Sequence, residues 1–152
     1  MGRSRTDIDE IEQLELEILR RAHTLAVVGF SSNPTRAGYY VPAYMQRAGY
    51  RIVPVNPELS EALGSPAYPD LHAIPFPIDC VLIFRRPDYI PAIVEQAIDI
   101  HAKYIWMQLG LHHEEAAARA RAAGLGVIMN ACIMVEHTRL VSRLEGDRRG
   151  SG

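Results

Sequence analysis

The sequence predicts an α/β domain built on a five-stranded parallel sheet, and three observations support that prediction. Five short apolar runs recur along the chain, each rich in Val, Ile or Leu. The runs are continuous rather than alternating, which is typical of strands buried on both faces of a parallel sheet. Stretches with helical spacing separate the runs, and such strand–helix–strand units connect parallel strands through right-handed crossovers. We therefore expect three layers, with helices on both faces of the sheet.

The first expected element is an amphipathic helix at residues 7–21. Thr6 or Asp7 is expected to cap its start. Its apolar residues fall at three- and four-residue spacings, as one buried helix face requires; they are Ile8, Ile11, Leu14, Ile18 and Leu19. This helix precedes the alternating pattern, so it is an additional N-terminal helix packed on the domain.

Strands and helices then alternate to the end of the chain. The expected strands, the fourth with its exit loop, are residues 24–30, 51–57, 78–84, 104–110 and 125–130. The expected helices are residues 37–48, 87–102, 114–123 and 133–144, with a short helical turn near 70–73. Pro42 is expected to mark a first turn or a kink. These elements divide the chain into the N-terminal helix (1–23), the α/β domain (24–144) and a flexible tail (145–152).

Composition narrows the class of protein. The chain has 152 residues, of which 48% are hydrophobic, and a formal net charge of -2, as expected of one globular domain. A chain without surplus positive charge is not expected to bind nucleic acid. Cys80 lies within an apolar run and reads as a core residue, so the two cysteines predict no disulfide framework and favour a cytoplasmic setting. We expect no membrane partner, and either a monomer or a homodimer.

Polar and glycine residues follow every expected strand. In an open parallel sheet, ligands bind outside the carboxyl ends of the strands. The residues that collect at this edge are Gly29, Ser31, Ser32, Asn33, Arg36, Asn56, Pro57, Arg85, Arg86, Gln108, Gly110, Asn130 and Cys132. The edge thus combines hydroxyls, amides, glycines and three arginines, which predicts a ligand site.

The loop after the first strand indicates the kind of ligand. Gly29 permits a tight turn and a close backbone approach, and the following helix N-terminus favours an anion. The loop reads GFSSNPTRAG, without the G-x-G-x-x-G spacing, and the second strand ends in Asn56 rather than in Asp or Glu. Both features argue against an ordinary NAD site. The arginines suit a ligand with several phosphates.

The chain also resembles a known family. In order, it contains GFSSNPTRAGYYVPAYMQRAGYRIVPVNP, FRRPDYIP, WMQLG and NACIMVEH. These stretches resemble the small stand-alone CoA-binding proteins, which are similar in turn to the N-terminal CoA-binding domain of the succinyl-CoA synthetase α subunit. The resemblance covers residues from about 24 to about 137 and implies a Rossmann-like fold, with coenzyme A laid across the strand ends.

By this resemblance, the loop from Ser31 to Pro34 wraps the phosphates, and Asn56 and Pro57 lie beside the adenosine. The two arginines after the third strand line the cofactor, and the segment after the fourth strand lies near the pantetheine arm. The residues expected to bind coenzyme A are therefore Gly29, Phe30, Ser31, Ser32, Asn33, Pro34, Arg36, Asn56, Pro57, Arg85, Arg86, Gln108, Leu109 and Gly110.

Two departures limit what the resemblance implies. The synthetase domain has a lysine just beyond the second-strand turn, where this chain has Glu58 and Leu59. A nucleotide 3′-phosphate would then need Arg36 or another cation. The phosphorylated histidine of the synthetase belongs to a second domain that matches no part of this sequence, so the ligase reaction does not carry over.

Cys132 is the one candidate nucleophile, because it precedes an expected helix and Glu136 and His137 follow one turn later. The alternative is a packed cysteine at a helix start. The run from His112 to Glu115 lacks the spacing of a metal motif, so no metal is expected.

Three functions remain open. The first is a module or regulator that binds coenzyme A or acyl-CoA without evident catalysis. The second is a thiol-dependent CoA or acyl-transfer enzyme that uses Cys132. The third is an NAD(P)-binding domain, against which Asn56 counts.

Overall fold

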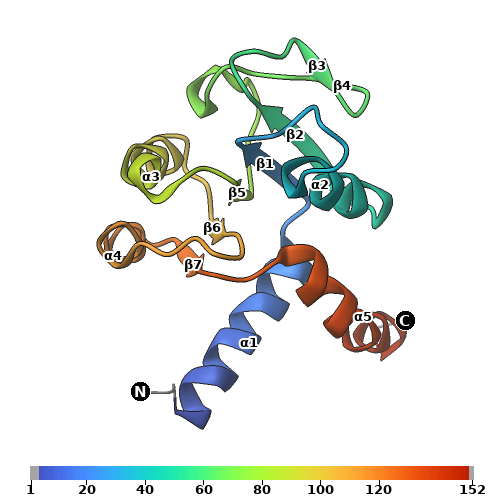
Figure 1. Ribbon diagram of the computed structural model, residues 1–152. Helices are drawn as coiled ribbons and strands as arrows, with labels where there is room; N and C mark the ends of the chain where they lie inside the picture. Colours follow the sequence, from blue (N-terminus) through green and yellow to red (C-terminus); the bar gives the residue numbers. More distant parts are fainter. Residues whose placement is uncertain (1–3, 151–152) are drawn as a thin grey trace.

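The structure is a computed structural model that describes residues 4–150, with side chains described through residue 146. It is an α/β domain of three layers (Figure 1). Its strands are β1 (Thr24–Val28), β2 (Arg51–Val55), β3 (Glu61–Ala62), β4 (Ser65–Pro66), β5 (Cys80–Ile83), β6 (Tyr104–Met107) and β7 (Gly126–Ile128). Its helices are α1 (Arg5–Arg21), α2 (Ala37–Arg47), η1 (Leu71–Ala73), η2 (Pro87–Tyr89), α3 (Ile90–Asp99), α4 (Glu114–Ala122) and α5 (Ile133–Gly150).

The main sheet contains five parallel strands in the order β2-β1-β5-β6-β7, which confirms the predicted sheet. Strand β1 lies inside the sheet, where Leu25 pairs with Ile52 on one side and with Cys80 on the other. The chain moves from β1 outward to β2, then returns to the other side of β1 to form β5. The strand order therefore reverses between β1 and β5, and a crevice opens at the carboxyl ends of these two strands.

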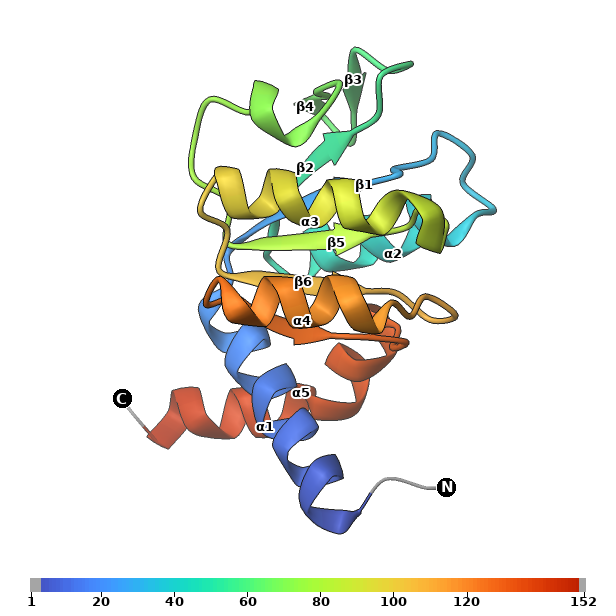
Figure 2. The ribbon, with the colours of Figure 1, turned by 90° about the vertical axis from the view of Figure 1, so that its left-hand side faces the viewer.

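Each face of the sheet has its own apolar core, because successive side chains of a strand point to opposite faces. Ala26 and Val81 pack against α3 and α4, whereas Leu25 and Leu82 pack against α1, α2 and α5. This explains why the strands read as unbroken apolar runs. Cys80 is fully buried, as predicted, and burial raises the pKa of its thiol. Figure 2 shows α3 and α4 in front of the sheet, with α1 and α5 extending beneath it.

The additional N-terminal helix is present, but its predicted cap is wrong. Ser4 caps α1: its hydroxyl accepts a hydrogen bond from the Asp7 backbone N–H at 3.1 Å, and the Asp7 carboxylate accepts one from the Ser4 N–H at 3.3 Å. This reciprocal capping box satisfies two N–H groups that the helix itself leaves unpaired. The helix therefore starts at Arg5, and Asp7 belongs to its first turn.

A short hairpin and the length of the last helix also differ from the prediction. A short hairpin pairs β3 with β4 through Leu63 and Gly64, whose φ angles of 51° and 76° suit a two-residue turn. Leu-Gly is a weaker sequence signal for such a turn than Asn-Gly. Helix α5 continues to Gly150, beyond its predicted end at Leu144, since one glycine costs a helix only about 1 kcal/mol. The flexibility predicted for residues 145–152 stays a prediction, and residues 151–152 lie outside the described chain.

Pro42 lies inside α2, beyond its first turn, and is buried. A proline at such a position removes one helical hydrogen bond and costs about 3 kcal/mol in an isolated helix. The missing donor is the one that would reach the carbonyl of Gly38, four residues earlier. Within residues 4–150, no helix has the length and apolar character needed to cross a membrane.

Candidate functional site

A cavity of about 440 Å³ opens at the carboxyl ends of β1, β2 and β5. Gly29 and Phe30 line it from the loop after β1, and Asn56 and Pro57 line it from the end of β2. The rest of its wall comes from the segments around Arg85, η1 and α3. This is the crevice at which the strand order reverses, and the loops after β1 and β6 project from the same edge, on the right of Figure 2. The volume lies within the usual range of small-molecule sites, about 300–1,000 Å³.

The cavity gathers five of the predicted cofactor residues: Gly29, Phe30, Asn56, Pro57 and Arg85. The loop residues Ser31, Ser32, Asn33, Pro34 and Arg36 lie beside it rather than in its wall. Arg86 is not in the cavity wall, but it lies near Tyr89, which is. The segment after β6 lies further along the sheet edge and holds Gln108, Leu109 and Gly110.

Sequence reasoning missed the wall that η1 and α3 contribute. Leu71 of η1 and its N-cap residue Asp70 line the cavity, as do Ile93 and Gln96 of α3. Ile93 and Gln96 are three residues apart, so they share one helix face, and that spacing was the available signal. Tyr89 also lines the cavity and follows Arg86 by three residues, at the end of η2. We predicted ligand residues only immediately after strands, and these residues reach the cavity from neighbouring elements.

Position 29 requires glycine for two reasons: the φ angle of its turn and the close approach of the segment that follows β5. Its φ of +88° is one that L side chains rarely adopt, and its N–H donates to the Val55 carbonyl at 3.2 Å. A Cβ atom at this position would lie 2.9 Å from the Phe84 carbonyl oxygen and 3.1 Å from Arg85 Cδ. The absent side chain therefore lets the loop after β1 pass directly over the end of β5.

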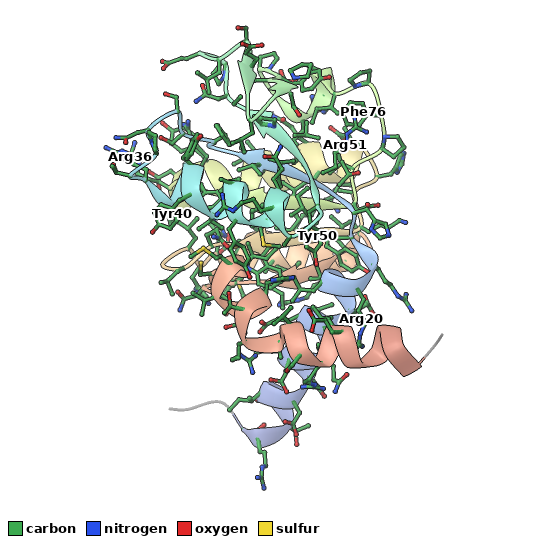
Figure 3. All side chains as sticks on the ribbon, turned by 90° about the vertical axis from the view of Figure 1, so that its right-hand side faces the viewer. Arg20, Arg36, Tyr40, Tyr50, Arg51 and Phe76 are labelled. Atoms are coloured by element: carbon green, nitrogen blue, oxygen red, sulfur yellow. The ribbon has the colours of Figure 1, made fainter. Side chains whose placement is uncertain are left out.

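The loop between Gly29 and α2 is held by its own hydrogen bonds. The Ser31 hydroxyl accepts from the Asn33 N–H at 3.1 Å, and the Asn33 side-chain oxygen accepts from the Thr35 N–H at 3.0 Å and the Thr35 hydroxyl at 2.7 Å. No side chain caps α2, whose N-cap is Arg36. Arg36 projects outward at the start of the helix, with Tyr40 next to it on α2 (Figure 3). The uncapped N-terminus keeps its preference for an anion.

The Asn56 side chain links the loop after β1 to the segment that follows β2. Its side-chain N–H donates to the Phe30 carbonyl at 2.8 Å, and its side-chain oxygen accepts from the Glu58 N–H at 2.8 Å. The ring of Phe30 is only 1% exposed and packs at 5.8 Å, centroid to centroid, from that of Tyr39. Asn56 and Phe30 therefore anchor the loop after β1, a role that the sequence did not indicate.

Two guanidinium groups and one aromatic ring mark the mouth of the cavity. The Arg85 guanidinium carbon lies 4.0 Å from the Tyr89 ring centroid, and that of Arg86 lies 5.8 Å from it. Cation–π attraction of this kind orders both partners. A hydrogen bond to Arg86, and then the charges of both arginines, lower the pKa of Tyr89. The mouth therefore presents concentrated positive charge to an incoming ligand.

The segment after β6 is tied to the start of α5. The Gln108 side-chain oxygen accepts from the Ile133 N–H at 3.0 Å, and its nitrogen lies 3.9 Å from the Cys132 sulfur. The Gly110 N–H donates to the Asn130 side chain at 2.7 Å. Leu109 is 72% exposed at the tip. This part of the edge lies outside the cavity but follows the strand next to β5.

The two predicted partners of Cys132 have other contacts. Glu136 pairs with Arg139 at 2.8 Å, and His137 Nδ1 lies 2.8 Å from the Tyr44 hydroxyl. The thiol itself is partly exposed. The side chain beside the Cys132 sulfur is that of Gln108, and both predicted partners have contacts with other residues.

The histidine and glutamate run after β6 serves the start of α4. The His113 ring accepts a hydrogen bond from the Ala116 N–H at 3.0 Å, and His112 lies 3.0 Å from the Glu114 carboxylate. In the part of the chain that the structure describes, no three His, Cys, Asp or Glu side chains come together in a way that could hold a metal ion.

Comparison with known proteins identifies the family. The model of a CoA binding domain matches residues 23–138. The uncharacterized protein YneT of Bacillus subtilis (strain 168) is 45% identical over 121 residues, which cover 80% of this chain and 90% of that protein.

Solved structures give the same result for the fold. A hypothetical protein from Pyrococcus horikoshii OT3 is similar with a TM-score of 0.85 and 38% identity, covering 93% of this chain and 99% of that one. The apo form of an acetyl-coenzyme A synthetase 1 from Ca. Korarchaeum cryptofilum shares the fold, with a TM-score of 0.67 and 21% identity over 78% of this chain and 31% of that one. The match across residues 23–138 and the shared fold confirm the predicted Rossmann-like architecture, and this chain belongs to the CoA-binding domain family.

Proposed function

We propose that this protein binds coenzyme A, free or acylated, along the carboxyl edge of its sheet. The observation that carries the proposal is the cavity at the β1–β5 crevice, in a chain that belongs to the CoA-binding domain family. Its mouth combines a glycine turn with two arginines, the groups that a phosphate-rich nucleotide requires.

The cavity suits the adenosine end of the ligand. Pro57, Leu71 and Ile93 offer apolar surface for a base, and Asp70 and Gln96 add polar groups. At about 440 Å³ the cavity holds only part of a coenzyme A molecule. The pantetheine arm would therefore leave the cavity and follow the edge toward Gln108, Leu109 and Gly110, as the resemblance implies.

The phosphates would lie between the loop after β1 and the arginines. The N-terminus of α2, which no side chain caps, faces this loop, and Arg36 is its N-cap residue. Ser31 and Ser32 are the hydroxyl donors in reach of such a ligand, and Arg36 is the expected partner of a 3′-phosphate. The geometry gives no equivalent support to an NAD site. Asn56 stands where an NAD site would have a carboxylate for the ribose, and both polar atoms of its side-chain amide are hydrogen-bonded to backbone groups.

Calorimetric titration with coenzyme A, acetyl-CoA, NAD+ and NADP+ tests the proposal, together with native mass spectrometry of the purified protein. We expect saturable binding of coenzyme A or an acyl-CoA and none of the nicotinamide dinucleotides. Tight binding of NAD(P)+, with no binding of coenzyme A or any acyl-CoA, would overturn it.

The arginines at the mouth give a first prediction. Arg85→Ala should weaken coenzyme A binding about tenfold or more, because a charge-assisted contact to phosphate contributes roughly 1.5–3 kcal/mol. The affinity should also become less sensitive to salt. Arg119→Ala is the matched control. Arg119 of α4 pairs with Glu95 of α3 at 2.8 Å and does not line the cavity. Equal losses in the two variants would contradict a specific role for Arg85.

A variant of Cys132 distinguishes the hypothesis of a binding module from that of a thiol-dependent enzyme. Cys132→Ser is nearly isosteric and should leave the dissociation constant of coenzyme A within about twofold of wild type, because the sulfur's contact with Gln108 is long, at 3.9 Å, and Cys132 does not line the cavity. Incubation with acetyl-CoA, followed by intact-protein mass spectrometry and chromatographic measurement of released coenzyme A, then decides the second hypothesis. The two are measured separately because acyl transfer consumes the Cys132 thiol as it frees that of coenzyme A. Release of coenzyme A that depends on Cys132 would establish acyl transfer to its sulfur, and no release from wild type would exclude it.

A further inference from the structure

The proline inside α2 is connected to the loop proposed to bind the cofactor phosphates. Pro42 has no N–H, so the Gly38 carbonyl, four residues earlier, lacks its usual helical donor. The backbone N–H of Ser31 takes that place and donates to the Gly38 oxygen at 3.1 Å. A carbonyl that belongs to the helix thus holds the first hydroxyl-bearing residue of the loop.

The contact between this helix turn and the loop is made at the level of the backbone. Gly38 is buried, and a Cβ atom on it would lie 3.0 Å from the Gly29 oxygen and 3.4 Å from the Ser31 nitrogen. A proline ring also crowds the carbonyl four residues before it, which tilts that carbonyl away from the helix axis. Gly38 therefore permits the approach, and Pro42 leaves the acceptor available to Ser31.

We propose that Pro42 is a positioning residue, which keeps the Gly38 carbonyl available so that the Ser31 loop is held ready for its ligand. The proposal rests on the proposed function for its ligand, coenzyme A. It accounts for a buried proline in a helix interior, where the residue is otherwise unfavourable. A loop ordered before binding loses less conformational freedom when the ligand arrives, and the affinity is higher for that reason.

The proposal predicts opposite effects on the fold and on the ligand. In Pro42→Ala the new backbone N–H of residue 42 can donate to the Gly38 carbonyl, which gives α2 one more hydrogen bond. The Ser31 N–H must then compete for the same oxygen, and its own hydrogen bond is weakened. The free energy of unfolding should stay the same or rise, while the affinity for coenzyme A should fall about three- to tenfold. If Pro42 served only the packing of α2, its replacement would lower both the free energy of unfolding and the affinity for coenzyme A.

The decisive measurement needs no ligand. Amide hydrogen exchange of Ser31, followed by NMR in the free full-length protein, should be about tenfold or more faster in Pro42→Ala than in wild type. Gly38→Ala tests the same contact from the helix side and should also accelerate it. Pro91→Ala is the control, because Pro91 lies in the first turn of α3, which packs on the opposite face of the sheet from α2.

The outcomes separate this proposal from the proposed function. Unchanged Ser31 exchange in Pro42→Ala, or a fall in stability that parallels the fall in affinity, would overturn the role of Pro42. Failure of the wild-type protein to bind coenzyme A would overturn the proposed function, while the exchange rates would still decide whether Pro42 controls the loop.

Discussion

Gly29→Ala is expected to lower the free energy of unfolding by about 2–3 kcal/mol and to weaken coenzyme A binding about tenfold or more. Two costs add at this position. The φ of +88° is strained for any residue with a side chain, and the new Cβ would lie 2.9 Å from the Phe84 carbonyl oxygen. The loop must move away from β5 to relieve that contact, which opens the cavity mouth at Arg85.

Gly124→Ala provides the control for Gly29. Gly124 has a similar φ of +93°, but no heavy atom lies within 4 Å of a Cβ placed on it, so only the backbone strain remains. It should cost about 1 kcal/mol and leave coenzyme A binding unchanged. Urea unfolding and calorimetric titration of both variants test the pair. Equal stability losses would show that the Phe84 contact is relieved without cost, contrary to this expectation.

The stability of the domain is expected to fall by about 2–4 kcal/mol between pH 5 and pH 8, because of Glu15. Glu15 is 5% exposed at the contact between α1 and α5. Burial, and then its hydrogen bond with Glu136, raise its pKa from 4.5 to about 8. Between these two values the folded protein holds a proton that the unfolded chain releases. The free energy of unfolding therefore falls as the pH rises through this window, and levels off above it.

The neighbouring charges act in a different range. Hydrogen bonds to Arg139 and Glu15 lower the pKa values of Glu12 and Glu136 respectively, so their contributions are lost as the pH falls below 4.5. Glu15→Gln keeps the shape of the protonated carboxyl and should flatten the profile between pH 5 and 8. The exposed Glu58→Gln should retain the wild-type slope. Urea unfolding at several pH values measures both, and an unchanged slope in Glu15→Gln would refute the assignment.

The sheet was predictable because its strands are buried on both faces and so appear as unbroken apolar runs. The ends of the strands were less predictable: β1 stops at Val28 and β2 at Val55, two residues before the predicted end of each. Glycine and apolar residues continue the pattern of the strand after pairing has ended, so composition alone does not mark the last paired residue.

The candidate site was predictable where cavity-lining residues stand within two residues of a strand end, as Gly29 and Arg85 do. It was not predictable where a residue acts through a distant partner. The contact of Asn56 with Phe30 and that of Gln108 with Ile133 join segments more than 20 residues apart. Asp70 and Gln96 reach the cavity through the packing of η1 and α3 against the sheet edge. The assignment of individual residues to coenzyme A stays a prediction.

The contact between the first and the last helix has a consequence for synthesis on the ribosome. Arg139 and Arg143 of α5 pair with Glu12 of α1 at 2.6 Å and 3.1 Å, across 127 and 131 residues of sequence. Helix α1 leaves the exit tunnel well before α5, which buries part of the apolar face of α1. Nascent chains shorter than this span cannot dock α1 in its final place. Helix α1 therefore completes its packing only after α5 has been synthesised, when the strands of the sheet are already available.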